Sequence, residues 1–162
     1  MPDAIARQTI REVVPLSRDD RIGAAARRLL DEELPALPVV DEKGGFVGIF
    51  GEREFMIALF PAYFDELGSA AMVRRSLDET IDRRSGCTAL AVSEHMTTAH
   101  VVVEDEYSDT QLAEIFLHHR VLIVPIATRG RVHALITRGE FFRLLAEKVL
   151  ESADEQLEDY GN

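Results

Sequence analysis

Residues 34–55 read LPALPVVDEKGGFVGIFGEREF, and this stretch decides the fold class of the chain. Two short β-rich runs, ALPVV and FVGIF, flank the turn-forming sequence DEKGG, and this pattern predicts a β-hairpin. The second run continues into the helix-like sequence GEREFMIALF with no loop between them. The stretch therefore predicts a strand that ends directly on the start of a helix.

The same pattern of apolar and polar positions recurs in the second half of the chain. Pro38-Val39 corresponds to Pro125-Ile126 at an offset of 87 residues, and Glu54-Phe55 corresponds to Glu140-Phe141 at an offset of 86. The second hairpin, in which ATRGR replaces DEKGGF, accounts for the lost residue. Each copy predicts the order β-α-β-β-α, with a right-handed parallel crossover followed by an antiparallel hairpin.

Each copy is expected to open with a short strand, at residues 13–16 and 101–103, followed by helix-capping residues. The predicted caps are Ser17 with Asp19 and Asp20 in the first copy, and the capping-box spacing Ser108-x-x-Gln111 in the second. Amphipathic helices follow, the first of which is expected to end at Pro35 and Pro38. The two closing helices carry more apolar side chains than one packing face requires, so a second covering surface is expected, from the sister repeat or a second subunit.

The repeats divide the chain into four segments. We predict repeat 1 at residues 8–60, a helical linker or insertion at 61–91, repeat 2 at 92–150 and an acidic C-terminal tail at 151–162. Helical periodicity inside the insertion is seen at Ala70, Val73, Leu77 and Ile81. Aromatic residues gather at and before it, which favours either a partner surface or a satellite core: Phe50, Phe55, Phe60, Tyr63 and Phe64.

Composition excludes several classes of partner. A chain of 162 residues with 46% hydrophobic content can bury a core, and its net charge of −11 disfavours nucleic acids and anionic membrane surfaces. No apolar run approaches the roughly 18 residues of a spanning helix. The single cysteine, Cys87, cannot form an internal disulfide. We therefore expect a cytoplasmic protein.

The sequence shows no arrangement typical of catalysis or metal binding. His118 and His119 are adjacent, so they point in different directions on a helix, and the other histidines have no partners at ligand spacing. Cys87 has no recognisable base nearby, and Gly44-Gly45 is not followed by the Lys and Ser/Thr of a P-loop. We expect no catalytic residue, no metal site and no required cofactor, and thus a protein that is not an enzyme.

The repeated pattern resembles the cystathionine β-synthase (CBS) domain, and two copies in tandem resemble a Bateman module. The residues that carry the resemblance are AARRLLDEELPALPVVDEKGGFVGIFGEREF in the first copy, and the lead-in V-x-E-x-M-T with Thr137 in the second. The resemblance implies an α/β fold with mixed sheets, built from two pseudo-symmetric β-α-β-β-α repeats with a helical insertion between them. It also implies a homodimer.

The resemblance further implies that the strand-to-helix junction binds an adenine-containing ligand, such as AMP, ADP, ATP or S-adenosylmethionine. The family motif Gly-h-x-Thr/Ser-x-x-Asp falls on Gly48 to Glu54 in copy 1, which lacks the hydroxyl, and on Ala134 to Glu140 in copy 2, which keeps it. Both copies carry Glu in place of Asp. The residues carried over as the ligand site are those of copy 2: Thr137, Glu140, Arg138, Ile123, Pro125 and Val102.

Other interpretations stay open. Thr137-x-x-Glu140 is also an ordinary capping box, in which the hydroxyl accepts from the Glu140 amide and the carboxylate returns a hydrogen bond. The leading function is a non-catalytic regulatory module that senses an adenine ligand, chiefly at repeat 2. The alternative is a dimerisation or interaction module with decayed nucleotide sites and an unknown protein partner.

Overall fold

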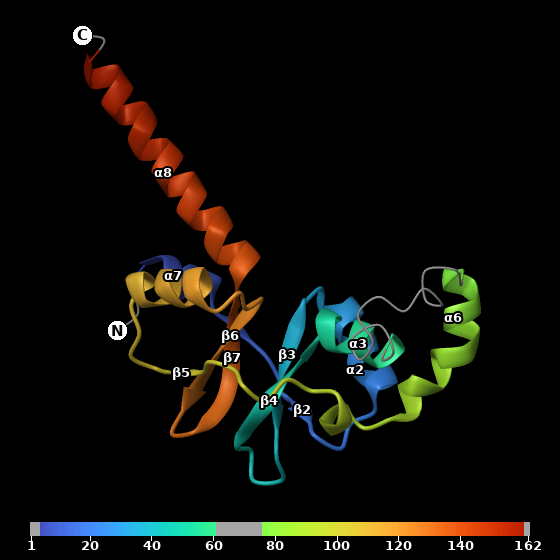
Figure 1. Ribbon diagram of the computed structural model, residues 1–162. Coiled ribbons are helices and arrows are strands. Elements are labelled where there is room, and N and C mark those ends of the chain that lie inside the picture. Colours follow the sequence, from blue (N-terminus) through green and yellow to red (C-terminus); the bar gives the residue numbers. More distant parts are fainter. Residues whose placement is uncertain (1–3, 61–75, 161–162) are drawn as a thin grey trace. The chain divides into compact units, whose positions relative to one another are not determined.

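The computed structural model describes residues 4–60 and 76–160 of the chain (Figure 1). The chain divides into two compact units. The central unit is formed by residues 15–100, and the terminal unit by residues 1–14 together with 101–162. Each unit contains one mixed sheet with helices packed on it, so the predicted α/β class with two mixed sheets is confirmed.

The central unit has a three-stranded sheet in the order β2-β3-β4. Strand β2 is parallel to β3, and β3 and β4 form the predicted antiparallel hairpin. Its elements are β2 (Leu16–Ser17), α2 (Ile22–Glu32), β3 (Ala36–Val40), β4 (Phe46–Gly51), α3 (Glu52–Leu59), α6 (Leu77–Arg84) and the 3-10 turns η1 (Ser85–Ala89) and η2 (Val92–Glu94). Fully buried side chains, including Phe50, Leu37 and Ile22, form its core.

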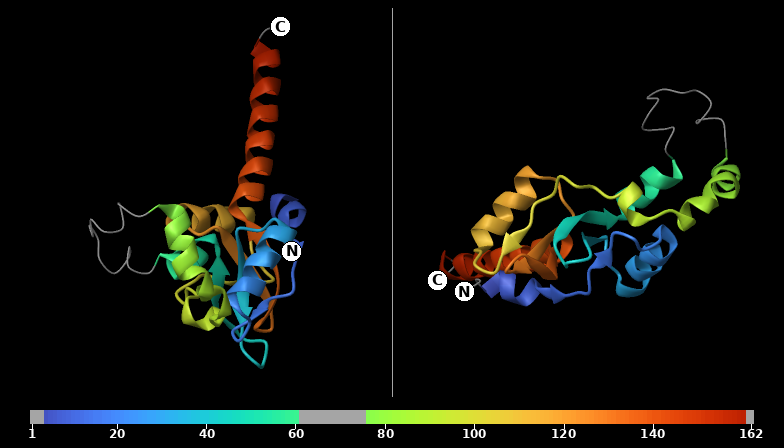
Figure 2. Two further views of the ribbon diagram at one scale, coloured as in Figure 1. Left: turned by 90° about the vertical axis from the view of Figure 1, so that its right-hand side faces the viewer. Right: turned by 90° about the horizontal axis from the view of Figure 1, so that it is seen from below.

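The terminal unit has a four-stranded sheet in the order β1-β7-β6-β5. Its elements are α1 (Ala4–Thr9), β1 (Arg11–Glu12), β5 (Val103–Glu104), α7 (Asp109–His118), β6 (Ile123–Thr128), β7 (Arg131–Thr137) and α8 (Arg138–Tyr160). The core cluster joins α1, α7 and the first turn of α8 to one face of the sheet, through Ile5, Ile115, Val124, Ile136 and Phe141 among others. Figure 2 shows the remainder of α8 extending away from this sheet.

The strand registers obey the sequence repeat. In the central unit Ala36 pairs with Gly51, and Ile123 pairs with Thr137 at the same place in the terminal unit. Both hairpins shift register at equivalent points, after Val39 and after Ile126. The offsets of 87 and 86 residues therefore superimpose two hairpins of the same design.

The segment that leads into each repeat packs in the unit of the other repeat. Arg11 of β1 pairs antiparallel with Leu135 in the terminal unit, and Thr97 forms the equivalent bridge to Ile49 in the central unit. The run expected as one strand at residues 13–16 is divided, because Val13 donates to the His133 carbonyl in the terminal unit whereas β2 starts at Leu16.

The predicted N-terminal cap of α2 was wrong. The helix begins at Ile22 after Arg21, and Ser17 and Asp20 instead form a local turn in which the Ser17 amide donates to the Asp20 carboxylate at 2.9 Å. The helix ends at Glu32, before Pro35 as predicted, and its C-cap residue Glu33 adopts the left-handed conformation with φ of 53°. The other predicted cap is confirmed, because the Ser108 hydroxyl accepts from the Gln111 amide at 3.1 Å.

The predicted insertion is described only in part. Leu77 and Ile81 lie on α6 as expected and are 60% and 42% exposed. Ala70, Val73, Tyr63 and Phe64 lie outside the described residues. Arg84 links α6 to the end of α3 by donating to the Ala58 carbonyl at 2.9 Å.

Candidate functional site

Three of the predicted site residues, Thr137, Arg138 and Ile123, lie at the strand-to-helix junction of the terminal unit. Strand β7 ends at Thr137 and α8 begins at Arg138, so no loop separates them. The Arg138 amide donates to the Leu122 carbonyl at 2.9 Å, which fixes the start of the helix to the end of the neighbouring strand. Ile123 is the cross-strand partner of Thr137 and is fully buried.

Polar groups of this junction are partly engaged. The Thr137 hydroxyl accepts from the Glu140 amide at 3.2 Å, which leaves its own proton free to donate to a ligand oxygen. The second hydrogen bond of the expected capping box, from the Thr137 amide to the Glu140 carboxylate, is replaced by another. The Glu140 carboxylate instead accepts from Arg143 at 2.9 Å. This ion pair holds the pKa of Arg143 above its ordinary value. Both partners are about half exposed, so the pair adds little stability.

The start of α8 has a backbone amide with open space beside it, where an anion could bind. Of the first three amides of α8, those of Arg138 and Glu140 already donate to Leu122 and Thr137. In the described part of the chain the amide of Gly139 has no such partner, and a Cβ built there would meet nothing within 4 Å. A helix start with a free amide and open space beside it favours a phosphate or carboxylate group.

The apolar residues of the predicted site lie on the adjoining strands. Pro125 is buried and pairs with Leu135, while Val102 is 38% exposed just before β5. Because Val124 and Ile126 point into the core cluster, the alternation of a strand directs Ile123 and Pro125 to the opposite face of the sheet. The six predicted residues therefore fall into a polar group at the start of α8 and an apolar group along the sheet.

The equivalent junction of the central unit is closed by packing. Gly51 occupies the position of Thr137, and a Cβ built on it would lie 2.4 Å from the Pro35 carbonyl oxygen and 2.5 Å from the Ala36 Cβ. The φ of Gly51 is −153°, an ordinary extended value, so crowding alone requires glycine here. The hydroxyl that the family motif supplies therefore has no space in this copy.

Glu54 of the central unit is buried, a feature that sequence reasoning missed. Its side chain is 3% exposed, whereas its counterpart Glu140 is exposed at the surface. Burial raises the pKa of the Glu54 carboxyl, and the positive charge of Arg53, with hydrogen bonds that include those from the Gly51 amide and the Thr97 side chain, opposes the rise only in part. The lead-in segment that carries Thr97 gave no local signal of this contact in the sequence.

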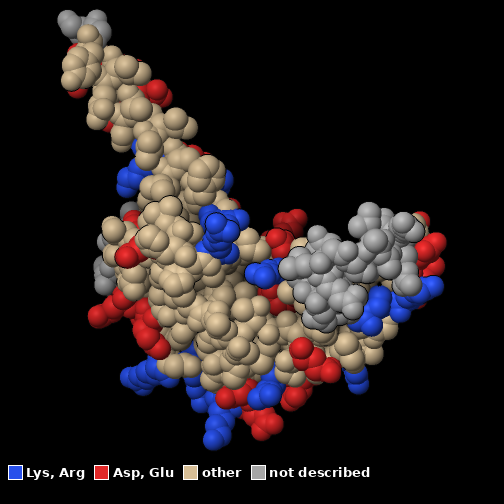
Figure 3. Space-filling model, viewed as in Figure 1, with Lys and Arg blue, Asp and Glu red and all other residues tan. Residues whose placement is uncertain are grey.

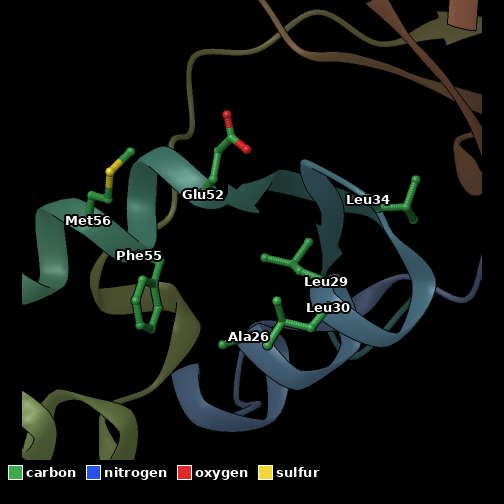
Figure 4. Close-up of a pocket in the computed structure, with 7 residues that line it drawn as sticks. All are labelled: Ala26, Leu29, Leu30, Leu34, Glu52, Phe55 and Met56. Atoms are coloured by element: carbon green, nitrogen blue, oxygen red, sulfur yellow. The ribbon is translucent and has the colours of Figure 1, made fainter. Parts of the chain in front are cut away.

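An apolar groove runs between α2 and α3 of the central unit, with a volume of about 300 Å³. Figure 4 shows the side chains that line it, Ala26, Leu29, Leu30, Leu34, Glu52, Phe55 and Met56. Leu30 is 77% exposed and Met56 is 48% exposed. Glu52 is the single charged residue of this lining, so the groove suits an apolar partner surface.

A small polar cluster in the terminal unit corrects one sequence inference. His133 was expected to have no acidic partner, yet its Nε2 lies 3.4 Å from Asp105 and 2.8 Å from the Thr128 hydroxyl. The Thr128 hydroxyl also donates to Asp105 at 2.6 Å, and this bond is the main reason that the pKa of Asp105 is lowered. Both contacts of His133 use the same nitrogen, so the cluster lacks the relay geometry of a catalytic triad. Within residues 4–60 and 76–160, no three His, Cys, Asp or Glu side chains gather as a metal site would require.

The paired units define a class of protein: a tandem α/β repeat with one strand-to-helix junction in each copy. Residues 6–61 match the family model of the CBS domain. The fold is similar to that of a CBS-domain containing protein from Agrobacterium tumefaciens, at 27% identity over 86% of this chain and 88% of that one, with a TM-score of 0.62. It is also similar to the CBS domain of a CBS-domain containing membrane protein from Sphaerobacter thermophilus, at 26% identity over 83% and 82%, with a TM-score of 0.64.

The resemblance to the CBS domain seen in the sequence is therefore confirmed, by the family model over residues 6–61 and by CBS-domain proteins of similar fold. The protein CBSX2, solved in complex with AMP, shares the fold at 19% identity, with a TM-score of 0.62 over 86% of this chain and 95% of that one. Among the residues that the structure describes, no helix combines the length and the apolar character needed to cross a membrane.

Proposed function

We propose that this protein is a non-catalytic regulatory module that binds an adenine-containing ligand at the junction of the terminal unit. The observation that carries the proposal is the set of donors at the start of α8: the Thr137 hydroxyl and the Gly139 amide, with Arg138 beside them. The AMP complex of CBSX2 supports adenine as the base. AMP, ADP, ATP and S-adenosylmethionine all fit this description.

Each predicted residue has a separate role in the proposal. Thr137 and the Gly139 amide donate to phosphate or ribose oxygens, and Arg138 supplies positive charge to a phosphate. Glu140 accepts from ribose hydroxyls after exchanging its bond to Arg143. Ile123, Pro125 and Val102 supply the apolar side for the purine ring. We propose one ligand per chain, because crowding at Gly51 supports a closed junction in the central unit.

Regulation requires that the ligand prefer one conformation of the protein over another. We propose that the protein acts as a homodimer, as the family resemblance implies, and that a partner protein reads the bound state.

The proposal is tested by thermal melting with AMP, ADP, ATP, S-adenosylmethionine and GTP. A ligand at 100 times its dissociation constant stabilises the folded state by about 2.7 kcal/mol, which is a rise of roughly 5–10 °C for a chain of this size. Calorimetry should give one site per chain. No shift with any adenine ligand at millimolar concentration would refute the proposal.

Three variants separate binding from helix capping. Thr137→Ala removes the helix cap as well as the ligand donor, so its own unliganded melting point is the reference, with a loss of about 0.5–2 kcal/mol expected there. Thr137→Ser keeps both functions and is the matched control. Glu140→Gln keeps the backbone amide that donates to Thr137 and removes only the carboxylate, so weaker binding at unchanged stability would assign Glu140 to the ligand.

The second candidate function is an interaction module, favoured by the exposed apolar groove between α2 and α3. Leu30→Glu and Met56→Glu change exposed side chains, so both variants should fold. A change in oligomeric mass without any response to nucleotides would favour this function over ligand sensing.

A further inference from the structure

Helix α8 exposes a continuous apolar stripe along its length. The residues of this stripe, here called the α8 stripe, are Phe142, Ala146, Val149, Ala153, Leu157 and Tyr160. Phe142, Val149, Leu157 and Tyr160 are 67%, 59%, 70% and 92% exposed. Phe141 is instead only 4% exposed because it lies in the core cluster, so the face of α8 that packs on its own unit is a different one.

The α8 stripe has a repeat of eleven residues. Phe142, Ala146 and Val149 recur as Ala153, Leu157 and Tyr160, each eleven positions later. Eleven residues make three turns of 3.67 residues, close to the natural period of an α-helix, so the stripe stays on one face and a helix pair along it would have a right-handed supercoil. A helix of this length is roughly 35 Å long, and the stripe covers most of it. Such regularity favours another helix as the covering surface.

The charges on the rest of α8 exclude an anionic lipid surface as that covering partner. A helix that binds such membranes carries Lys and Arg on its polar face. The second half of α8 instead carries five acidic residues and no basic one: Glu151, Asp154, Glu155, Glu158 and Asp159. Figure 3 shows mostly uncharged side chains along the face of α8 turned to the viewer.

The charge is unevenly distributed along the helix. Residues 138–149 carry three basic and two acidic side chains, for a net charge of +1, whereas residues 150–160 carry five acidic side chains, for a net charge of −5. Two parallel copies would place the acidic halves together, which costs energy through like-charge repulsion. Two antiparallel copies would place each acidic half beside the half that carries Arg138, Arg143 and Lys148.

We propose that the α8 stripe pairs with the α8 stripe of a second copy of this chain, in antiparallel orientation about residue 151. This register places Phe142 opposite Tyr160 and Val149 opposite Ala153, and it places Leu157 opposite Leu145, which lies beside the stripe and is 38% exposed. Aromatic pairs close both ends, and a larger side chain meets a smaller one near the centre. The inference assigns a surface to the homodimer proposed above, and it does not depend on nucleotide binding.

Oligomeric mass tests the pairing. Leu157→Glu would bury two carboxylates in the paired helices, and it should fold because the native side chain is 70% exposed. We expect sedimentation equilibrium of the full chain to show weaker dimerisation, with the dissociation constant of the dimer raised at least roughly tenfold. The matched control is Glu158→Gln on the opposite face, which should leave Kd unchanged. A wild-type chain that is monomeric at all concentrations, or a Leu157→Glu chain that dimerises as the wild type does, would overturn the proposal.

Spin-label distances test the orientation. In a Cys87→Ala background, single cysteine labels replace Glu151 or Glu158. The antiparallel register places the two copies of residue 151 at the same height along the helix axis, and it separates the copies of residue 158 along the axis by about 21 Å, at 1.5 Å per residue. Equal distances for both labels would indicate a parallel pair and overturn the proposal. The nucleotide-dependent melting shift is measured separately, so its failure and the failure of this pairing are distinguishable.

Discussion

Replacing Gly51 by threonine tests why the central junction carries glycine instead of a hydroxyl residue. Crowding by neighbouring atoms, and not a positive φ, accounts for the glycine. A Cβ at residue 51 would lie 2.4 Å from the Pro35 oxygen, 2.5 Å from the Ala36 Cβ and 2.8 Å from the Ala36 Cα. Two of these three neighbours are backbone atoms, so no side-chain rotation relieves the contact. The same backbone accepts the Glu52 amide at 2.9 Å, and a shift that makes room would stretch this bond.

The expected cost of Gly51→Thr follows from this crowding. Overpacking of a well-packed site costs about 1–3 kcal/mol. For a chain of this size each kcal/mol corresponds to about 2–4 °C, so a melting point lower by about 2–12 °C is expected. Circular dichroism melting and urea unfolding measure the change.

Gly139→Thr is the matched control, since it makes the same chemical change at the start of the other junction helix. A Cβ there meets nothing within 4 Å, so a change within about 0.5 kcal/mol is expected. Equal melting points for wild type and Gly51→Thr would show that the central junction accommodates the threonine side chain without loss of stability. The proposed limit of one ligand per chain would then lose its support.

Three further perturbations test other parts of the structure. Because burial raises the pKa of Glu54 above its ordinary value of 4.5, the folded state retains a proton that the unfolded chain releases, so stability should fall as pH rises from about 4.5 through the folded pKa. Urea unfolding of Glu54→Gln across this window should show a flatter dependence and, at pH 7, no loss of stability. Ser108→Ala should cost about 1 kcal/mol by removing the cap of α7, and equal unfolding curves would contradict this role. Asp109→Ala should lower the hydrogen-exchange protection of the Ile5 and Ala6 amides, which donate to its carboxylate at 3.2 and 2.7 Å, whereas unchanged protection would show that α1 is held by packing alone.

Local sequence signals were sufficient for the hairpins and their repetition. Turn-forming residues around Gly44 and Gly130 alternate with β-rich runs, and these features act over fewer than ten residues. Both glycines indeed have positive φ, at 81° and 76°. The order β-α-β-β-α followed from the same signals together with the rules for crossovers. Ser108 was recognisable as a cap because its partner lies three residues away.

Contacts across long sequence separations were not predictable in the same way. Arg11 pairs with Leu135, and the strand that carries Arg11 is two residues long, so no period or turn marks it. The same holds for Thr97, whose bridge to Ile49 helps to bury Glu54. The predicted cap of α2 also failed. Ser17 and Asp20 resemble capping residues, but the Asp20 carboxylate accepts from the Ser17 amide and the Ser17 hydroxyl accepts from the Asp19 amide, so both side chains close a local turn.

The two junctions show how a repeated design can be divided between stability and binding. Loss of the hydroxyl at residue 51 and burial of the carboxylate at residue 54 belong together, because the Gly51 amide hydrogen-bonds to Glu54 and the Thr97 side chain completes the enclosure. In the terminal unit the Thr137 hydroxyl accepts from the Glu140 amide, and the Glu140 side chain remains at the surface. In the closed junction the buried carboxyl of Glu54 makes the stability of the folded state fall as pH rises. The open junction retains the exposed donors and acceptor that a small anionic ligand would need, so the proposed ligand belongs to the terminal unit.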